Sequence, residues 1–290
     1  MATIKLIRRR IKSASNISQI TRAMEMVAAS KMKRAQEAAN SGKPYAQKIY
    51  QAVAELGAHA KEKSHPLLMQ TNPTGKKLII LISTNKGLCG GLNTNLFRSL
   101  TPLIHKEKTN IEFVSVGKKG EAFVVRAGSY LVADFSHLPA FTESVVSITK
   151  FAIEGFVKGT YGQVYVVYNN FISALKQIPT MKRILPIGNF EGPQDTVVET
   201  RTHFTTEFLF EPSREEILNS LLPHYLENQI RSAILEAQAA EHSARMIAMK
   251  NATDAALDLV DALTLSYNKA RQEKITYEIA DIVTAREAVK

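Results

Sequence analysis

Two long stretches at the ends of the chain contain neither glycine nor proline. They cover residues 1–41 and 224–290, while all 14 glycines of the 290 residues fall between Gly42 and Gly192. Glycine and proline are the residues least compatible with a helix interior, so both ends are predicted to be long helices. From Pro223 the second would run about 90 Å at 1.5 Å per residue. A compact domain cannot bury such a helix, which is therefore expected to extend beyond it.

The faces of these two helices indicate that they pack against each other. The N-terminal segment carries an apolar stripe, and the C-terminal segment carries a seam of alanines that would let another helix approach closely. "SREE" places Ser213 as N-cap and Glu216 three positions later, a capping box, and Pro223 is expected to kink the helix or mark its start. The stripe comprises Ile4, Ile7, Ile11, Ala14, Ile17, Ile20, Met24 and Val27, and the seam Ala233, Ala237, Ala240, Ala244, Ala248, Ala252 and Ala255.

The middle of the chain alternates between strand and helix patterns. β-rich runs occupy residues 78–83, 111–116, 129–135 and 163–169, with helical stretches near 94–107, 118–127 and 143–158. Residues 181–187 and 203–210 are candidate edge strands. Such alternation is typical of a parallel α/β sheet. The predicted class is α/β, with a globular α/β domain at 61–210 between an N-terminal helix at 1–60 and a C-terminal helix at 211–290, the two helices projecting from it as a rod.

The stretch "STNKGLCGGLNTN", residues 83–95, follows a strand and precedes a helix, as phosphate-binding loops do. It lacks both phosphate-loop patterns, since Lys86 comes before the glycines and no G-x-G-x-x-G occurs. The glycines are explained instead by backbone positions with positive φ or by close packing. We therefore predict no direct nucleotide binding and no cofactor.

The remaining residues offer little evidence of chemistry. Cys89 has no base arranged for it and is expected to be a packed thiol. The seven histidines show no paired ligand spacing, so no metal site is predicted, and no catalytic residues can be singled out. The first 41 residues carry a net charge of +7 out of +10 for the chain. Such a basic arm suits nucleic acid, an anionic membrane surface or an acidic protein partner, although its apolar stripe favours helix packing over nucleic acid.

Three long segments, in order, closely resemble the signature regions of the gamma subunit of F-type ATP synthase. They are "IRRRIKSASNISQITRAMEMVAASKMKRAQ" (7–36), the glycine stretch 83–95, and "EHSARMIAMKNATDAALDLVDALTLSYNKARQEKITYEIADIV" (241–283). The resemblance implies that the terminal helices form a long antiparallel coiled coil and that the α/β domain is a Rossmann-like foot. It further implies a non-catalytic central-stalk rotor that couples proton-driven rotation of a membrane ring to conformational changes in a ring of alpha and beta subunits. The implied partners are those two subunits, the epsilon subunit and the membrane rotor ring, and not nucleic acid.

The resemblance also implies contact residues. Arg271 and Gln272 match a pair that contacts a loop of a beta subunit, and Met24 matches a shaft position packed near that contact. Lys86 corresponds to a basic residue of the glycine motif, and Glu211 to a foot residue facing the membrane ring. The chain departs from many relatives at Asn85, where they carry an acid, and at Arg286 and Glu287, where they are small and apolar.

The location implied by the resemblance is peripheral, at the cytoplasmic face of a bacterial inner membrane. The first residues show no signal peptide, and no apolar run reaches the length of about 20 residues that a membrane span needs. One cysteine cannot form an internal disulfide, which favours a reducing compartment. The alternatives left open by the residues are a nucleotide-binding α/β enzyme and a basic coiled-coil protein that binds nucleic acid.

Overall fold

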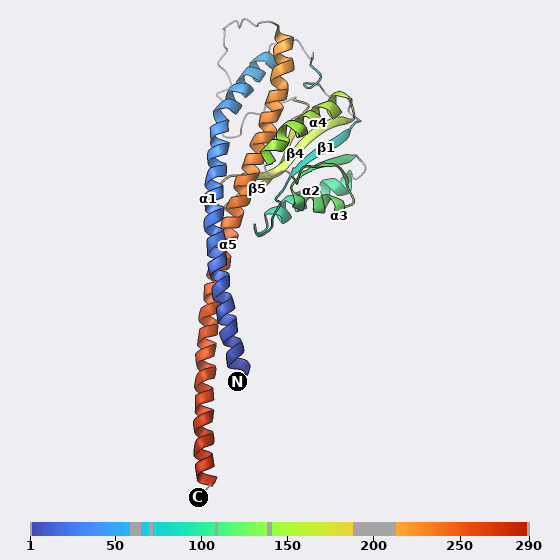
Figure 1. Ribbon diagram of the computed structural model, residues 1–290. Coiled ribbons are helices and arrows are strands. Elements are labelled where there is room, and N and C mark those ends of the chain that lie inside the picture. The colour runs from blue at the N-terminus through green and yellow to red at the C-terminus, as the bar shows by residue number, and fades with distance from the viewer. Residues whose placement is uncertain are drawn as a thin grey trace. The chain divides into compact units, whose positions relative to one another are not determined.

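The computed structural model describes residues 2–58, 65–69, 72, 74–107, 110–137, 141–187 and 213–288. It divides into two compact units, which are described separately. The helical unit comprises residues 1–30 and 245–290, and the sheet unit comprises residues 31–244. Two long helices, α1 (Ala2–Ala58) and α5 (Arg214–Ala288), each contribute a segment to both units (Figure 1).

A five-stranded sheet with the order β3-β2-β1-β4-β5 forms the centre of the sheet unit. β1 (Lys76–Ile82) pairs in parallel with β2 (Ile111–Val116) on one side and with β4 (Tyr161–Phe171) on the other. β3 (Tyr130–Asp134) extends the parallel part, while β5 (Gln177–Leu185) pairs with β4 antiparallel. The strand order reverses between β1 and β4, which makes this the topological switch point of the sheet.

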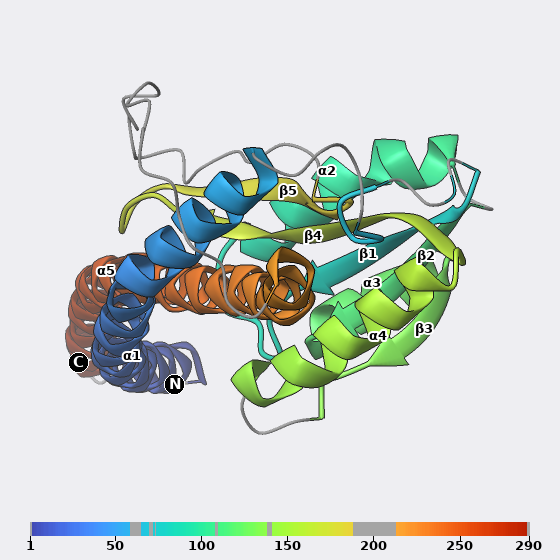
Figure 2. The same cartoon turned by 90° about the horizontal axis from the view of Figure 1, so that it is seen from above.

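Successive residues of β1 point to opposite faces of the sheet, and each face is covered by helices. Ile79 and Leu81 pack in a cluster with α2 (Leu92–Lys106) and α3 (Lys118–Arg126). Leu78, Ile80 and Ile82 pack in a second cluster with α4 (Val145–Val157), the end of α1 and the start of α5. Figure 2 shows α2 on one side of the sheet and α4 and α5 on the other. A single 3-10 turn, Phe141–Ser144, precedes α4.

In the sheet unit, α5 begins where the sequence predicted. The amide of Glu216 donates to the Ser213 hydroxyl at 3.3 Å, which is the expected N-cap contact. Pro223 and Pro44 both lie inside helices, so α5 starts nine residues before Pro223 and α1 continues through Pro44. Ile49 and Val53 of α1 share the larger core with Leu222 of α5.

In the helical unit, the inward positions of α1 and α5 follow a strict three-four spacing, which is the repeat of a coiled coil. The two helices meet at Thr21 and Thr253, whose hydroxyl oxygens lie 2.7 Å apart, and the chain termini lie at the same end of this unit (Figure 1), as in an antiparallel pair. The positions of this three-four series are Ile4, Ile7, Ile11, Ala14, Ser18, Thr21, Glu25 and Ala28 of α1, and Met246, Met249, Thr253, Ala256, Val260, Leu263, Tyr267, Ala270 and Lys274 of α5. Beside the series, Ser15, Met24 and Ala29 of α1 and Arg245, Ile247, Ala248 and Ala252 of α5 are half-buried as well.

The predicted packing faces are partly wrong in this unit. Ile17, Ile20 and Val27, which the sequence placed on the packing stripe, are exposed, and Ala255 of the predicted alanine seam is exposed as well. Two successive steps of three residues, from Ala14 through Ile17 to Ile20, rotate the stripe away from the 3.5-residue seam that a partner helix requires. Ser18 and Thr21 occupy the seam instead.

The predicted α/β class with long terminal helices is confirmed, and four of the five strands were located correctly to within two residues at each end. β5 begins earlier than predicted and runs antiparallel, and α2 begins at Leu92. The candidate strand at 203–210 lies outside the described residues.

Candidate functional site

The carboxyl ends of β1 and β4 meet at the switch point, where open α/β sheets bind their ligands. The glycine stretch leaves β1 here. Its Cys89 and the first residue of α2, Leu92, are buried against Ala240 of α5, with Phe171 of β4 beside them. A segment of α5 therefore covers the crevice in which a nucleotide would lie in a Rossmann fold.

The space that remains at this point is very small. A cavity of about 10 Å³ is lined by Ser83, Thr84, Asn169 and residues of α5 including Gln238 and Glu241. This volume accommodates about one water molecule. The side-chain oxygen of Asn169 is buried without a hydrogen-bond partner in the structure, which gives such a water a polar group to bind. The cavity cannot hold a nucleotide.

The amides at the start of α3, which could receive a phosphate, already have protein partners. The Lys118 amide donates to the Asn85 side-chain oxygen at 3.0 Å, and the Lys119 amide donates to the Thr84 carbonyl at 3.1 Å. The Gly120 amide donates to the Ser83 hydroxyl at 2.7 Å. These three bonds remove the free N–H groups on which anion binding at a helix N-terminus depends.

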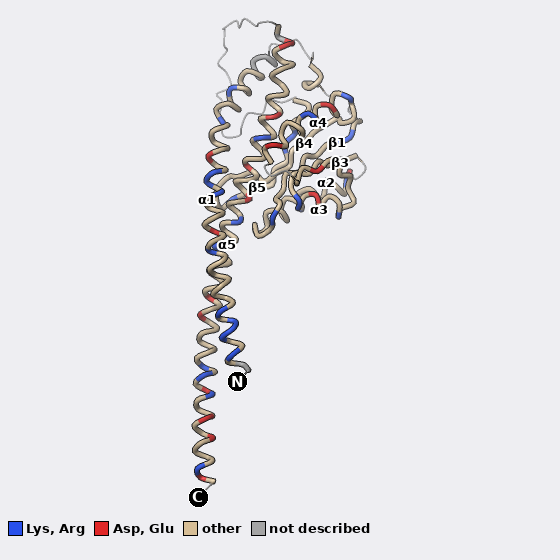
Figure 3. The backbone as a smooth tube through the Cα atoms, in the orientation of Figure 1, with Lys and Arg blue, Asp and Glu red and all other residues tan. Residues whose placement is uncertain are grey.

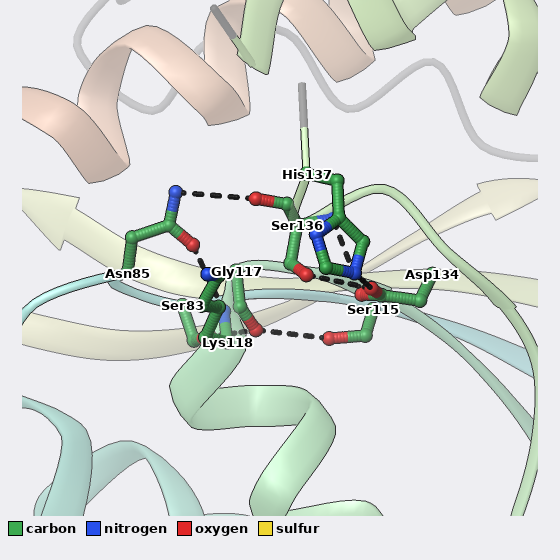
Figure 4. A network of polar contacts seen from close by, with 8 residues as sticks. All are labelled: Ser83, Asn85, Ser115, Gly117, Lys118, Asp134, Ser136 and His137. Carbon is green, nitrogen blue, oxygen red and sulfur yellow. Dashed lines mark hydrogen bonds and ion pairs between the residues drawn. The ribbon is translucent and has the colours of Figure 1, made fainter. Parts of the chain in front are cut away.

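A network of polar groups joins the ends of β1, β2 and β3 around these amides (Figure 4). The hydroxyls of Ser83 and Ser115 both donate to the Gly117 carbonyl at 3.1 Å. The Asn85 amide group donates to the Ser136 carbonyl at 3.4 Å. Asn85 thus donates one bond and accepts another, which a carboxylate at this position could not do. The arrangement therefore requires an amide rather than a carboxylate side chain at position 85.

Two glycines are required by this arrangement. Gly117 has a φ of 114°, in the region that favours glycine, and a Cβ there would collide with the Ser83 carbonyl. Gly90 has a φ of 58° within the glycine stretch, while its neighbour Leu88 has a positive φ as well and is 63% exposed. The stretch is thus a packed turn with an exposed apolar tip.

The contact residues implied by the resemblance lie in different places. Arg271 and Gln272 are exposed on α5, and Met24 is half-buried on α1, one turn after Thr21. Because Thr21 contacts Thr253, Arg271 lies 18 residues further along α5, about 27 Å at 1.5 Å per residue. The structure therefore does not bring Met24 and Arg271 together. Lys86 is exposed in the glycine stretch, and Glu211 lies outside the described residues.

Large apolar side chains lie exposed on the helical unit, among them Ile20, which the sequence had placed on the packing stripe, and Leu265, which no sequence argument had singled out. Ile20 of α1 is 60% exposed and Leu265 of α5 is 75% exposed. From Arg271 to Ala288, α5 continues past the start of α1 as a helix with exposed apolar residues such as Ile282. Figure 3 shows Lys and Arg gathered on the first turns of α1. The sequence carried a signal for this exposed surface, because the two helices have more apolar residues than a packing seam with a 3.5-residue repeat can bury.

Within the described residues, no group of His, Cys, Asp and Glu side chains could hold a metal ion. Among the helices that the structure describes, none is long and apolar enough to cross a membrane.

Comparison with known proteins identifies the family. A family model described as ATP synthase matches residues 3–289. The chain is similar to the ATP synthase gamma chain of Roseiflexus castenholzii, with 41% identity over 100% of this chain and 99% of the relative. It is also similar to that of Opitutus terrae, with 44% identity over 99% and 98%.

Solved structures show the same fold. A Tetrahymena thermophila mitochondrial ATP synthase structure, described as central stalk and c-ring, matches with 26% identity and a TM-score of 0.58 over 80% of this chain and 99% of that one. A chain of the Euglena gracilis mitochondrial ATP synthase matches with 18% identity and a TM-score of 0.65 over 99% and 95%. From end to end, therefore, this chain belongs to the family of ATP synthase gamma chains.

Proposed function

We propose that this chain is the central-stalk rotor subunit of an ATP synthase. In this role it couples proton-driven rotation of the membrane ring to conformational changes in the catalytic ring of alpha and beta subunits. The observation that carries the proposal is the match to gamma chains along the whole length, at 41% identity and with 99% of the relative covered. The described central-stalk and c-ring match at 26% identity points in the same direction.

The chain itself is a non-catalytic subunit in this proposal. Support comes from the switch point of its sheet, where Ala240 of α5 packs against Leu92 and leaves only a cavity of about 10 Å³. Support also comes from the amides of Lys118, Lys119 and Gly120, which already donate to protein oxygens. Nucleotide chemistry then belongs to the surrounding subunits.

The helical unit supplies the surface that a rotor needs. Large apolar side chains such as Ile20 and Leu265 are exposed, whereas the fully buried residues between its helices are Ala, Ser and Thr apart from Met249. Exposed apolar surface of this kind marks an interaction site. A shaft whose sides differ stabilises different conformations of each surrounding subunit as it turns, and this difference in binding free energy is what couples rotation to nucleotide affinity.

The contact residues and the location are part of the same proposal. Arg271 and Gln272 are exposed on a helix, where they can reach a beta subunit. Met24 is half-buried and contributes at the shaft, and Lys86 is exposed and contributes at the glycine stretch. Glu211 is assigned to the contact with the membrane ring, and epsilon is a further partner. We assign the complex to the cytoplasmic face of a bacterial inner membrane, and the gamma chains of Roseiflexus, Opitutus and Legionella among the relatives support this assignment.

Reconstitution tests this function. The chain is combined with alpha and beta subunits for ATP hydrolysis, and with the membrane sector in vesicles for ATP-driven proton pumping. We expect both activities to depend on the chain, while the isolated chain shows no stoichiometric nucleotide binding. Stoichiometric binding of ATP by the isolated chain would favour an α/β enzyme. A steep, salt-dependent affinity for duplex DNA, with no effect on the ring, would favour a nucleic-acid-binding protein.

A further inference from the structure

Three polar residues of α5 line up along one stripe of the helix within the sheet unit. Gln229, Glu236 and Ser243 are spaced seven residues apart, so they lie almost above one another, about 10.5 Å from one to the next. Ser243 is completely buried, and the other two are half-buried. Polar residues at these positions need partners, since an unpaired buried polar group is costly.

Each of the three has a partner in the β4–β5 hairpin. Lys182 Nζ of β5 donates to Gln229 Oε1 at 2.8 Å. Burial raises the pKa of the Tyr168 phenol of β4, and the charge of Glu236 and a side-chain hydrogen bond to it raise that pKa further. The Ser232 hydroxyl holds the same carboxylate from the side of α5, at 3.2 Å.

Ser243 connects α5 to the tip of the hairpin. Its hydroxyl donates to the Ala174 carbonyl at 2.6 Å, and Gln177 Nε2 donates to its oxygen at 3.3 Å. The partners therefore follow the hairpin toward its tip as the residues of α5 follow the helix toward its C-terminus. We call Gln229, Glu236 and Ser243, with these partners, the polar seam.

Apolar contacts flank the polar seam, but they offer little resistance to rotation of α5 about its own axis. Ile230, Ala233 and Ile234 of α5 pack in the core of the sheet unit. Apolar burial is non-directional, so a helix can rotate or slide over such a surface at modest cost. Hydrogen bonds depend on angle and distance. Because the three residues share one stripe, any rotation of α5 about its own axis would break all of these bonds together.

We propose that the polar seam is the element that carries torque between the sheet and α5. It holds α5 against rotation about its own axis when the two are driven in opposite directions, and Ser243 is its principal positioning residue. This inference rests on the proposed rotor function. It goes further by assigning the transfer of force inside the sheet unit to three named positions of α5.

The test is rotation under load in the complex of this chain with alpha and beta subunits. The ring is fixed to a surface, ATP drives rotation, and probes of increasing size are attached through Arg126→Cys. Arg126 is exposed on α3, which covers the face of the sheet opposite to α5, so the probe loads the sheet. Cys89 is buried and stays unlabelled.

The variant of the polar seam combines Gln229→Met, Tyr168→Phe and Ser243→Ala. Tyr168→Phe alone removes one hydroxyl and keeps the test decisive if the triple variant fails to assemble. The matched control is Thr180→Val, which removes a hydroxyl from the residue opposite Tyr168 in the same hairpin. The Thr180 hydroxyl donates to the Ile178 carbonyl of its own strand, not to α5.

With the smallest probe, all variants should rotate at the wild-type rate. With the largest probe, the triple variant should turn at least twofold more slowly than wild type, Tyr168→Phe should show a smaller slowing, and Thr180→Val should match wild type. Equal slowing of wild type and both seam variants at every load would overturn the inference. The proposed function fails in a different way, since the tagged wild-type chain would then show no ATP-driven rotation at all.

Discussion

The interiors of the two units are built from different side chains. The sheet unit completely buries Phe113, Phe156 and Ile80, with further Leu, Ile and Val residues around them. The helical unit buries Ala14, Ala28 and Thr253 along its seam. Buried apolar area sets the scale of stabilisation, at about 25 cal/mol per Å². The sheet unit is therefore expected to be stable by itself, whereas the helical unit has little apolar area to hold its helices together.

The two units also differ in the apolar side chains that they expose. The sheet unit exposes some apolar residues, such as Leu175 at 83%, but it has a large core besides. The helical unit exposes Ile20, Leu265 and Ile282, while its fully buried residues are Ala, Ser and Thr apart from Met249. What this comparison teaches is that the helical unit places its larger apolar side chains where partner subunits would bury them. Its stability then depends on assembly.

The largest expected effect is the difference in unfolding free energy between two Ile→Ala substitutions, one in each unit. Ile80→Ala removes a completely buried side chain from β1, and it should cost about 2–5 kcal/mol of unfolding free energy. Ile20→Ala removes a side chain that is 60% exposed, and in the isolated chain it should cost no more than about 0.5 kcal/mol. Urea unfolding of both variants measures the difference. Equal costs would show that the helical unit has a core of its own.

Arg271 and Gln272 test whether the exposed surface of the helical unit contacts partner subunits. Arg271 can form a bidentate pair with a carboxylate, and Gln272 can both donate and accept. A charge-assisted contact of this kind is worth about 1.5–3 kcal/mol. Replacing both residues with Ala should slow multisite ATP hydrolysis roughly tenfold to a hundredfold and weaken proton pumping, while assembly survives.

Arg271→Lys should restore only part of that loss, because an ammonium group cannot reproduce the planar fork of the guanidinium. The matched control is Lys250→Ala, which removes an exposed cation elsewhere on the helical-unit part of α5. Wild-type hydrolysis and pumping in the double Ala variant would mean that the two residues are solvated side chains on the helix.

Alkaline pH should weaken the sheet unit. Burial raises the pKa of Tyr225 to about 12, and burial with a hydrogen bond to Glu112 raises the pKa of Tyr161. Above pH 10 the unfolded chain releases these protons while the folded chain keeps them, so the free energy of unfolding falls as pH rises. Lys76 acts in the same direction, because its hydrogen bond to Glu112 raises its pKa.

Urea unfolding at pH 8, 10 and 11, followed through the sheet unit, measures this loss. Tyr161→Phe removes one of the titrating groups, so the variant should lose less stability than wild type between pH 8 and pH 11. A stability that stays constant across this range would contradict the assignment of these tyrosines as buried and protonated.

The smallest effect is expected at the end of α5. Removing the residues from Thr284 onward deletes a charged tail that includes Arg286 and Glu287 and that has little apolar area to bury. Assembly and rotation should remain largely intact, with ATP hydrolysis close to wild type. Loss of assembly after this truncation would show that the tip of α5 is an essential bearing rather than a solvated end.

Much of the fold was predictable because its signals are local. The runs at residues 111–116 and 118–127 became β2 and α3 nearly unchanged, and the Ser213 cap lies at the predicted start of α5. Local signals could not give the direction of β5, because an edge strand reads alike in either direction. They also could not show that Pro44 and Pro223 lie inside helices, where tertiary packing overrides the helix-breaking tendency of proline.

The candidate site was predictable only in part. The absence of a phosphate-loop pattern around Lys86 is a property of residue order, and it was readable without a structure. The occupation of the crevice by Ala240 was not readable, because about 150 residues separate it from Cys89. The polar seam was missed for the same reason, since the spacing of Gln229, Glu236 and Ser243 acquires meaning only beside the hairpin.

The amino-acid sequence by itself determined that both ends are helical, that the middle is an alternating α/β domain, and that the chain resembles gamma subunits. These properties follow from the placement of glycine and proline, from short-range periodicity and from motif order. Only the tertiary structure decided which face of each long helix is buried. Ile17 and Ile20 fit an apolar stripe better than Ser18 and Thr21 do, but a second helix accepts side chains only along a 3.5-residue seam, and Ser18 and Thr21 lie on that seam. The buried face of each helix is therefore set by contacts between two segments more than 200 residues apart in the sequence, such as the contact of Thr21 with Thr253.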